Sequence, residues 1–229
     1  MVRLSSKYNF VKPNDGRALG LMNAAAVAVL EELPDIRLAY GVSDEYSFVF
    51  DRTCKLFDRR ESKILTTVVS TFTAHYVNMW SSYISGKPLT TPMPSFDGRV
   101  VAYPSLQNLR DYMSWRQVDL QLGNMSTTQA EAQLKGTLAA DKNEILFSKF
   151  QINYNNEPGM FKKGSVIYRD YGVNKDPHEH GSADPEAWGF GMDGEKERKR
   201  PLKAKVTVEH VDIIKDDFWT RRPWLFAAM

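Results

Sequence analysis

The chain has 229 residues, 42% of them apolar and 25% charged, which is enough apolar material for the core of one large domain or of a domain with an appendage. Its single cysteine, Cys54, excludes an internal disulfide framework and a multi-cysteine zinc site. The formal net charge of +2 does not by itself indicate a nucleic-acid partner, and no apolar run approaches the roughly 20 residues of a membrane span, so we expect a soluble intracellular protein without a secretory signal.

The first strong helical pattern follows Asn14 and Asp15, either of which can cap a helix. Apolar residues then recur at helical spacing as far as Pro34, at Leu19, Met22, Ala26, Val29 and Leu33. Two short strands are predicted next, Ile36 to Gly41 and Tyr46 to Phe50. The four residues between them, Val42-Ser43-Asp44-Glu45, predict a hairpin with two acids at its tip.

The longest predicted helix runs from Arg59 to Tyr83, with an apolar stripe along one side. A loop rich in proline and threonine follows over residues 86–96. After it we expect a strand over Gly98 to Tyr103 and a helix over Ser105 to Asp119.

Two shorter helices are predicted over Thr127 to Lys135 and Leu138 to Phe150. The pattern fades after Tyr168, and the polar residues 170–200 are interpreted as a mobile loop. The alternation from Lys203 to His210 predicts a strand, and the aromatic tail from Phe218 to Phe226 is expected to pack on the body.

The order helix, strand, strand, helix, strand corresponds to a ferredoxin-like βαββαβ unit without its first strand. Such a sheet would lack a paired central strand, so either the fold differs or a strand near Arg3 and Leu4 is missing. We expect an α+β fold with an antiparallel sheet and a helical C-terminal extension. Residues 1–104 form the predicted core, and residues 105–229 form the extension.

The acids at the hairpin tip are candidates for metal binding. Mg²⁺ prefers oxygen ligands and is usually held by one or two protein carboxylates together with phosphates and water, and two such ions can assist phosphoryl transfer. Asp44 is the candidate ligand, with Glu45 as a second ligand or a support. The alternative interpretation is an ordinary solvated turn, because Ser, Asp and Glu are common in turns.

Basic residues offer candidate phosphate contacts at two helix starts. Lys12 precedes the first helix, where free N–H groups favour anions. Arg59, Arg60 and Lys63 cluster at the start of the long helix, where cations oppose the helix dipole and a bound triphosphate would offset their cost. Arg99 begins a predicted strand beside a turn. A solvated charged surface is the alternative for each of these residues.

Several segments resemble the eukaryotic tRNA-histidine guanylyltransferases, in order from about Lys7 to about Tyr168. The matching strings are Lys12-Pro-Asn-Asp15, Gly41-Val-Ser-Asp-Glu-Tyr-Ser-Phe48, Asp97-Gly-Arg-Val-Val101, Trp115-Arg-Gln117 with Asp119, Gly136-Thr-Leu-Ala-Ala-Asp-Lys-Asn-Glu-Ile-Leu-Phe147 and Ile152-Asn-Tyr-Asn-Asn156. A twelve-residue string matching in order is far more specific than one short motif.

The resemblance implies a polymerase-like palm with a ferredoxin-like core, working in the 3′–5′ direction with two Mg²⁺ ions. ATP would adenylylate the 5′-phosphate of tRNA-His, and the 3′-hydroxyl of GTP would then attack that activated end. Loss of pyrophosphate would leave a guanosine at position −1. A homotetramer in the cytoplasm, the nucleus or both is also implied.

The resemblance also implies roles for individual residues. It makes Asp44 a metal ligand and Glu45 a catalytic-site acid. The expected nucleotide contacts are Lys12, Asp15, Ser43, Arg60, Lys63 and Arg99. The residues expected to act on tRNA are Arg116, Asp119, Lys142 and Asn153.

Two departures from the family pattern matter for activity. The family places an Arg-x-Asp-Gly motif on its first strand, and here Arg3-Leu4 is followed by Ser5-Ser6-Lys7. The family continues Arg-Gln-x-Asp with Cys-His-Ile-Asn-Asn-Leu-Tyr-Asn, and here Leu120-Gln-Leu-Gly123 follows. The first of these departures, near Arg3 and Leu4, is also where the order of elements indicates that a strand is missing.

Three other functions remain open at this point. A nucleotide cyclase also presents acids on a hairpin but would not need Lys142 or the Trp115-Arg-Gln117 segment. A template-dependent polymerase that repairs tRNA 5′ ends would accept many tRNAs. A tRNA-binding protein that has lost its metal site is the non-enzymatic alternative.

Overall fold

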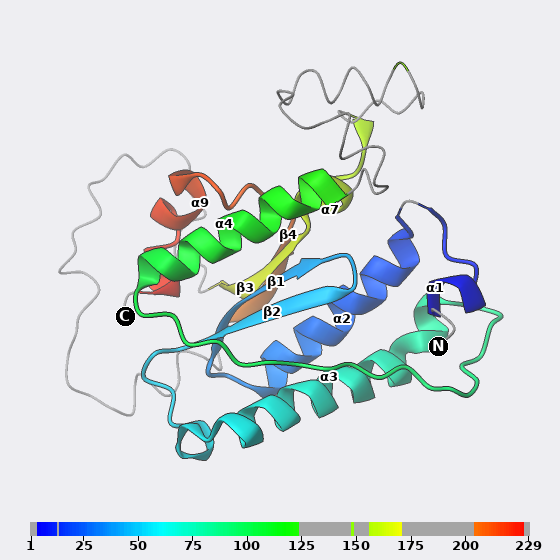
Figure 1. The fold of residues 1–229 in the computed structure, drawn as a ribbon, viewed down its shortest axis with the longest axis horizontal. Helices are drawn as coiled ribbons and strands as arrows, with labels where there is room; N and C mark the ends of the chain where they lie inside the picture. The colour runs from blue at the N-terminus through cyan, green and yellow to red at the C-terminus, as the bar shows by residue number, and fades with distance from the viewer. Residues whose placement is uncertain (1–3, 13, 124–147, 149–155, 171–203, 227–229) are drawn as a thin grey trace.

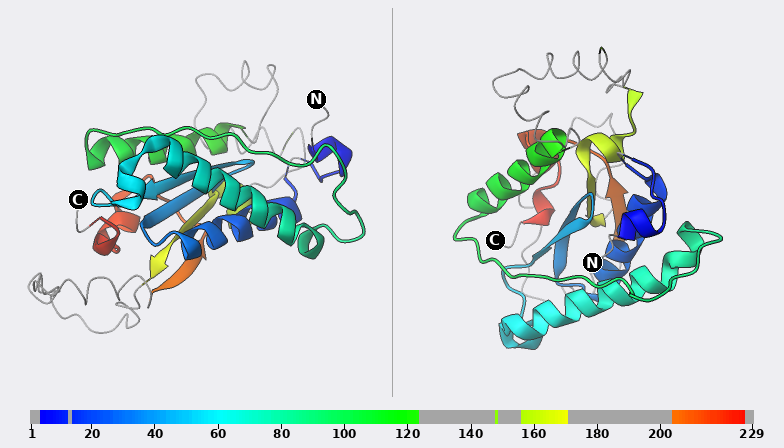
Figure 2. Two further views of the ribbon diagram at one scale, coloured as in Figure 1. Left: turned by 90° about the horizontal axis from the view of Figure 1, so that it is seen from below. Right: turned by 45° about the vertical axis from the view of Figure 1, so that its right-hand side comes forward.

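The computed structural model describes residues 4–12, 14–123, 148, 156–170 and 204–226, and for residues 119–123 it describes the backbone alone. A four-stranded antiparallel sheet lies between two groups of helices (Figure 1). Helices α2 and α3 cover one face, and α4 crosses the other face (Figure 2). The predicted helix over Thr127 to Lys135 lies outside the described residues. So do the predicted helix over Leu138 to Phe150, apart from the helical Ser148, and nearly all of the predicted 170–200 loop.

Helix α2 spans Gly16–Glu32, as the helical spacing predicted. Asp15 is its N-cap, and the carboxylate accepts hydrogen bonds from the backbone N–H groups of Arg17 and Ala18. Leu21, Ala25 and Val29 and their neighbours on the same face are buried against the sheet and α3. The short helix α1 (Leu4–Lys7) precedes α2.

The predicted hairpin is confirmed. Strand β1 spans Ile36–Val42 and pairs in antiparallel register with β2, Glu45–Phe50, so that Val42 lies opposite Glu45. Only Ser43 and Asp44 remain for the turn, and Ser43 has a φ of 54°. A two-residue hairpin loop needs a positive φ at its first position because only that twist matches the strands.

The sheet order is β2-β1-β3-β4. Strand β4, Lys205–Glu209, was predicted, whereas β3, Ser165–Asp170, was not. Helices cover both faces of β3, so its apolar residues run on without alternation and give no period-2 signal. Both strands belong to the C-terminal half, so this half contributes β3 to the sheet in addition to the predicted β4. Strand β1 pairs with β2 on one side and with β3 on the other. The sheet therefore has a paired central strand, which the order predicted from the sequence would have lacked.

Two cores occupy the two faces of the sheet. Helix α3, Glu61–Tyr83, packs Phe72, Tyr76 and Trp80 against α2 and one face. Helix α4, Leu106–Gly123, places Leu109 and Met113 against the other face. The predicted packing of the aromatic tail is confirmed, because residues of α9 (Asp216–Thr220) and of the 3₁₀ turn η4 (Pro223–Leu225) complete this second core.

Residues 98–103 do not form the predicted strand. They run as an extended segment in which Val100 and Val101 are 44% and 55% exposed. Within the described part of the chain, no backbone hydrogen bond joins this segment to β2, which is an edge strand. An alternating sequence forms a strand only beside a hydrogen-bonding neighbour, and the described residues include no strand at the place of the one missing from the ferredoxin-like order.

Two short elements precede α3 and β3. The turn η1 (Leu56–Arg59) leads into α3, and the short helix α7 (Gly159–Lys163) leads into β3. Among the residues described, no helix is both long and apolar enough to cross a bilayer.

Candidate active site at the hairpin tip

The hairpin is fixed to α2 by Tyr46. The buried Tyr46 hydroxyl donates a hydrogen bond to Oδ1 of Asn23, and burial raises the pKa of this phenol. The ring lies directly over Gly41, where an added Cβ would come within 2.3 Å of it. Gly41 therefore permits a close approach that holds the hairpin tip at a defined place above the helices.

Asp44 is exposed at the turn, and no hydrogen bond or ion pair joins its side chain to another described residue. It lies close enough to α3 to act electrostatically on Tyr76. Burial raises the pKa of Tyr76 to about 12, and the negative charge of Asp44 adds to this effect. Asp44 thus presents a carboxylate to solvent from a rigid support, as expected for a ligand of a metal that also binds substrate.

Glu45, in contrast, is engaged within the protein. Its carboxylate forms an ion pair with Arg116 of α4, whose side chain is only 14% exposed. The guanidinium carbon of Arg116 also lies 5.5 Å from the centre of the Trp115 ring, a cation–π contact. The structure therefore brings Glu45, at the hairpin, together with Arg116, a predicted tRNA-handling residue.

Gln117 lies in the quoted string Trp115-Arg-Gln117, but the sequence analysis gave it no role, and the structure shows it supporting the helix that carries Arg116. It is fully buried, and its Nε2 donates to the carbonyl oxygens of Lys163 and Val211 at 2.7 and 2.9 Å. Its Oε1 accepts from the backbone N–H of Ile213 at 2.8 Å. A polar residue in line with Leu109 and Met113, at spacing i+4, was the available signal, since a polar side chain on a buried helix face requires partners.

Asp15 lies at the start of α2, and its oxygens are taken by intramolecular donors. Besides its capping bonds it accepts from the backbone N–H of Val11 and forms an ion pair with Arg17 at 2.6 Å. The hydrogen bond from Arg17, with those from the backbone amides, holds the pKa of Asp15 well below its ordinary value despite burial. Lys12 is exposed just before it.

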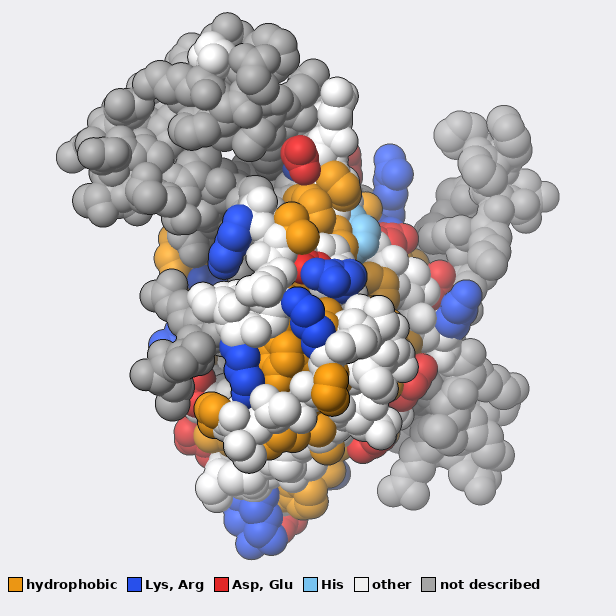
Figure 3. All heavy atoms as spheres, turned by 90° about the vertical axis from the view of Figure 1, so that its right-hand side faces the viewer, with side chains coloured by type: hydrophobic (Ala, Val, Ile, Leu, Met, Phe, Trp, Pro, Cys, Tyr) orange, Lys and Arg blue, Asp and Glu red, His pale blue; other side chains and the backbone are white. Residues whose placement is uncertain are grey.

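Basic side chains gather near the middle of the molecular face where α2 begins and α3 ends (Figure 3). Arg60 and Lys63 are not part of that end. They lie at the start of α3, and about 13 residues, or roughly 20 Å of helix, separate Lys63 from Tyr76 beside Asp44. Arg60 is bonded there to the carbonyl of Phe57 and to Asp58.

The other predicted residues have separate positions. Ser43 is exposed in the turn itself, and Arg99 is exposed on the extended segment near Tyr103. Asp119 lies on α4, in the part for which only the backbone is described. Lys142 and Asn153 lie outside the described residues, so their predicted roles stay predictions.

The candidate metal site has one free carboxylate. No group of three His, Cys, Asp or Glu side chains that could hold an ion occurs among the described residues. Asp44 alone suits an Mg²⁺ that arrives with nucleotide phosphates, since phosphates and water supply the remaining ligands. A second ion fits less well, because Glu45, the nearest carboxylate in sequence, is paired with Arg116.

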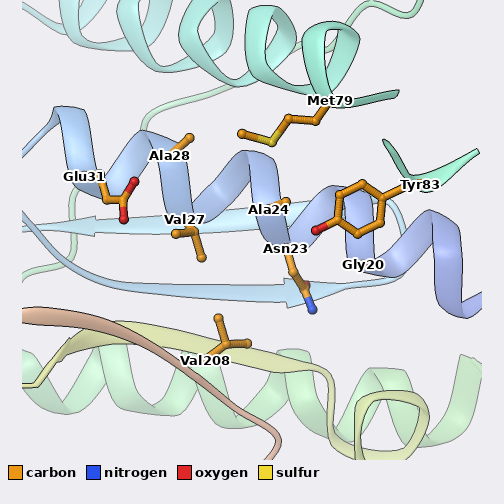
Figure 4. A pocket seen from close by; sticks show the side chains of 9 residues that line it. All are labelled: Gly20, Asn23, Ala24, Val27, Ala28, Glu31, Met79, Tyr83 and Val208. Atoms are coloured by element: carbon orange, nitrogen blue, oxygen red, sulfur yellow. The ribbon is translucent and has the colours of Figure 1, made fainter. Parts of the chain in front are cut away.

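A hollow of about 490 Å³ lies elsewhere, between α2, the end of α3 and β4 (Figure 4). Small residues of α2, including Gly20, Ala24 and Ala28, form its floor, with Met79 and Val208 beside them. Its lining is mostly carbon. Glu31 is the one carboxylate among its lining residues, and none of them is a lysine or arginine, whereas Asp44, Glu45 and Arg116 meet at the hairpin tip. The tip is therefore the better candidate for phosphoryl chemistry.

A carboxylate-tipped hairpin on an antiparallel sheet backed by helices is typical of proteins that carry out metal-dependent nucleotidyl transfer. The comparison with protein families specifies the class further. The family model described as tRNAHis guanylyltransferase matches residues 2–104, and the model of the C-terminal domain of that family matches residues 107–215. The chain belongs to the tRNAHis guanylyltransferase family.

Similar proteins occur across eukaryotes. The chain is 56% identical to a tRNA(His) guanylyltransferase of Neurospora crassa, with 99% of this chain and 85% of the relative covered. For the enzyme of Schizosaccharomyces pombe the identity is 44%, with 97% and 85% covered. The Neurospora alignment extends over 251 residues, more than this chain contains, so the relative has residues within the match that this chain lacks.

Solved structures agree with the fold. The tRNA(His) guanylyltransferase structure from Saccharomyces cerevisiae has a TM-score of 0.66 and 46% identity, covering 72% of this chain and 79% of that one. A bacterial Thg1-like protein in complex with ATP has a TM-score of 0.66 at 20% identity, covering 98% and 86%. The bacterial likeness supports the fold alone.

Proposed function

We propose that this chain adds a guanosine to the 5′ end of tRNA-His, using ATP and GTP. The family match along nearly the whole chain, with relatives named for this activity in several eukaryotes, supports the proposal. Within the structure, the observation that carries it is the exposed Asp44 carboxylate on the rigid hairpin, beside a Glu45 fixed by Arg116.

The proposed reaction has three steps. The 5′-phosphate of tRNA-His attacks the α-phosphate of ATP, which forms an adenylylated 5′ end and releases pyrophosphate. The 3′-hydroxyl of GTP then attacks the activated 5′-phosphate and releases AMP, so the chain grows in the 3′–5′ direction. Hydrolytic loss of pyrophosphate from the added residue leaves a 5′-monophosphate at position −1.

The residues of this chain have distinct parts in the proposal. Asp44 would hold Mg²⁺, which when bound would neutralise charge on the phosphate oxygens. Arg116 keeps the Glu45 carboxylate at the base of the hairpin turn. Lys12 and Arg99 are both exposed and therefore suited to phosphate contacts. Lys63 and Arg60 would contact phosphates at a separate place, since they lie at the far end of α3.

Finer features of the family also belong to the proposal. We take the sheet to be a ferredoxin-like palm without its first strand, which the open edge of β2 and the unpaired segment 98–103 support. Two Mg²⁺ ions, a homotetramer and an intracellular location complete the expectation. Asp15, Ser43, Asp119, Lys142 and Asn153 keep the roles that the resemblance implies.

One alternative has a specific observation in its favour. A tRNA-binding form with impaired catalysis would have few free carboxylates at its metal site, and Asp44 is the one free acid at this hairpin. A polymerase that repairs tRNA 5′ ends is the second alternative, and it differs in accepting tRNAs with other anticodons.

The test is label transfer from radioactive GTP to 5′-monophosphorylated tRNA-His in the presence of ATP and Mg²⁺. We expect incorporation by the unmodified chain, its loss in Asp44→Asn, and no change in Asp217→Asn, an exposed carboxylate on α9. Equal labelling of tRNAs with other anticodons would indicate end repair. Binding of tRNA without any labelling would establish the impaired form and refute the proposed reaction.

A further inference from the structure

An aromatic row lies along the side of α4 that borders the hairpin. The rings of Tyr103 and Tyr112 are 5.3 Å apart, and those of Tyr112 and Trp115 are 6.3 Å apart, each pair tilted by 35°. The Arg116 guanidinium lies over Trp115 at the end of the row. The row thus combines three rings with one guanidinium.

Trp115 is the exposed member of the row. It is 55% exposed, whereas Leu109, Met113 and Gln117 on the inward face of the same helix are 9% exposed or less. An indole is the largest apolar side chain, and leaving half of it in water gives up much of its burial free energy. Val118, less than one turn further along α4, is also exposed, at 38%, so the two side chains expose apolar surface together, which suits contact with something outside the described chain.

The surroundings hold Trp115 in place. The Tyr112 hydroxyl lies 3.3 Å from the Ser47 hydroxyl of β2, and Arg116 is paired with Glu45. Gln117 ties the same turn of α4 to Lys163, Val211 and Ile213. The exposed ring is therefore presented on a fixed helix beside the hairpin rather than on a free loop, which lowers the entropy cost of binding.

The charges nearby suit a nucleic-acid strand. Arg99 is exposed and lies near Tyr103: burial raises the pKa of the Tyr103 phenol, and the positive charge of Arg99 opposes that rise. Arginine planes and aromatic rings are the two kinds of side chain on which unpaired bases stack, and arginine also contacts phosphates.

We propose that Trp115 stacks an unpaired nucleobase of the RNA substrate, with Tyr112 and Arg116 holding the indole in position. The inference rests on the proposed function, because it assigns part of the tRNA to a surface next to the candidate active site. It concerns a base in a polynucleotide rather than a free nucleotide. A free nucleotide needs a concave pocket that buries most of it, and Trp115 stands on the outside of a helix and is not among the residues lining the hollow in Figure 4.

The experiment measures equilibrium binding of the full chain to fluorescently labelled, 5′-monophosphorylated tRNA-His without ATP. Trp115→Ala is expected to weaken binding by about tenfold, since stacking of one base contributes that much or more. Trp115→Phe keeps a stacking ring and is expected to stay within about threefold of the unmodified chain. The matched control Val208→Ala removes exposed apolar surface from β4, on the opposite edge of the sheet, and is expected to bind normally.

Salt dependence separates stacking from charge. Stacking releases no counterions, so the slope of log K against log salt is expected to be the same for Trp115→Ala and the unmodified chain. Arg99→Ala, in contrast, is expected to reduce that slope by about one if its side chain contacts a phosphate. Unchanged thermal unfolding of Trp115→Ala shows that the loss of affinity is not a loss of fold.

Binding of GTP alone provides the third comparison. We expect equal GTP affinity for Trp115→Ala and the unmodified chain. A loss of GTP binding with unchanged tRNA binding would assign the ring to the free nucleotide and overturn the proposal, as would tRNA binding that Trp115→Ala leaves unchanged, or no tRNA binding at all. The GMP-labelling assay reports the proposed function separately, so a chain that binds tRNA through Trp115 but adds no GMP would sustain this inference alone.

Discussion

Arg116 of α4 forms an ion pair with Glu45, the first residue of β2, and so links the C-terminal half of the chain to the hairpin. The pair is asymmetric, because the Arg116 side chain is 14% exposed and that of Glu45 is 65% exposed. Removal of Arg116 therefore also removes its packing on Trp115, whereas removal of Glu45 removes a group that is mostly in solvent.

We expect Arg116→Ala to destabilise the fold more than Glu45→Ala. A double-mutant cycle of the two is expected to give a coupling free energy of about 0.5–1 kcal/mol, measured by urea unfolding. The exposed pair Arg60 and Asp58 is the control, with side chains 55% and 86% exposed, and its coupling should be close to zero. Equal coupling in both pairs would contradict a special role for the Arg116 contact.

Gln117→Ala is expected to lower the free energy of unfolding by about 2–4 kcal/mol, because two carbonyls and one N–H would lose a buried partner. Gln117→Met retains the volume but not the hydrogen bonds, and we expect it to recover less than half of the loss. Val118→Ala, at the exposed neighbouring position, should change stability by less than about 0.5 kcal/mol. Full recovery by Gln117→Met would show that packing alone matters there.

Asp15 predicts a pH dependence. Its pKa in the folded chain is lower than in the unfolded chain, so its contribution is present above the unfolded pKa of about 3.9 and is lost as pH falls below it. We expect Asp15→Asn to cost about 1–2 kcal/mol at pH 7 and clearly less at pH 3, measured by urea unfolding at both pH values. Asp44→Asn, which removes an exposed carboxylate without a hydrogen bond among the described residues, should cost little at either pH. If Asp15→Asn lowers the free energy of unfolding equally at both pH values, the pKa of Asp15 is not lowered in the folded chain and the prediction is wrong.

Gly41→Ala is expected to displace Tyr46, because the new Cβ would meet the ring at 2.3 Å. The partly buried ring is held to Asn23 and packs against Phe48 and Phe72, so we expect a loss of stability of about 2 kcal/mol or more. Gly16→Ala is the matched control. Its Cβ would have Phe161 at 3.9 Å as its nearest neighbour, an ordinary contact in a helix, so stability should be unchanged or slightly higher. Similar stability of the two variants would mean that the hairpin tolerates a shift of Tyr46.

Hydrogen exchange tests the open edge. Amides of residues 98–103 are expected to exchange much faster than those of Leu38 to Gly41 in β1, because these β1 residues are paired on both sides and the extended segment is not hydrogen-bonded to β2. Protection of residues 98–103 equal to that of β1 would show that the segment pairs with a strand in solution.

The elements that sequence predicts well are those whose signals are local. The helix after Asp15 has an N-cap residue, an apolar face at helical spacing and a terminating Pro34 within one stretch of sequence. The hairpin likewise has its turn residues directly between two short strands. The carboxylates at the tip were therefore placed correctly on the hairpin. That Glu45 is engaged and Asp44 is free depends on Arg116, which lies 71 residues away in the chain, and no local pattern carries that information.

The failures concern contacts that are distant in sequence. Strand β3 was missed because both of its faces are buried and its residues do not alternate. The prediction of a strand over 98–103 was wrong. Alternation of apolar and polar residues indicates which side chains would share a face of a sheet, but it does not show that another strand is available for backbone pairing. The nucleotide contacts expected of Arg60 and Lys63 stay predictions, and the direction of α3 places both residues at the end of that helix opposite the hairpin tip.

The two faces of the sheet differ in when they are completed during synthesis. Helix α2, the hairpin and α3 are consecutive, so most of the core between them is present once the ribosome has made the first third of the chain. The opposite face depends on Ile213, Phe218, Trp219 and Leu225, which are made much later. Before these C-terminal residues are synthesised, the apolar side of α4 is not buried by them. The nascent chain then exposes apolar surface of the kind to which chaperones bind.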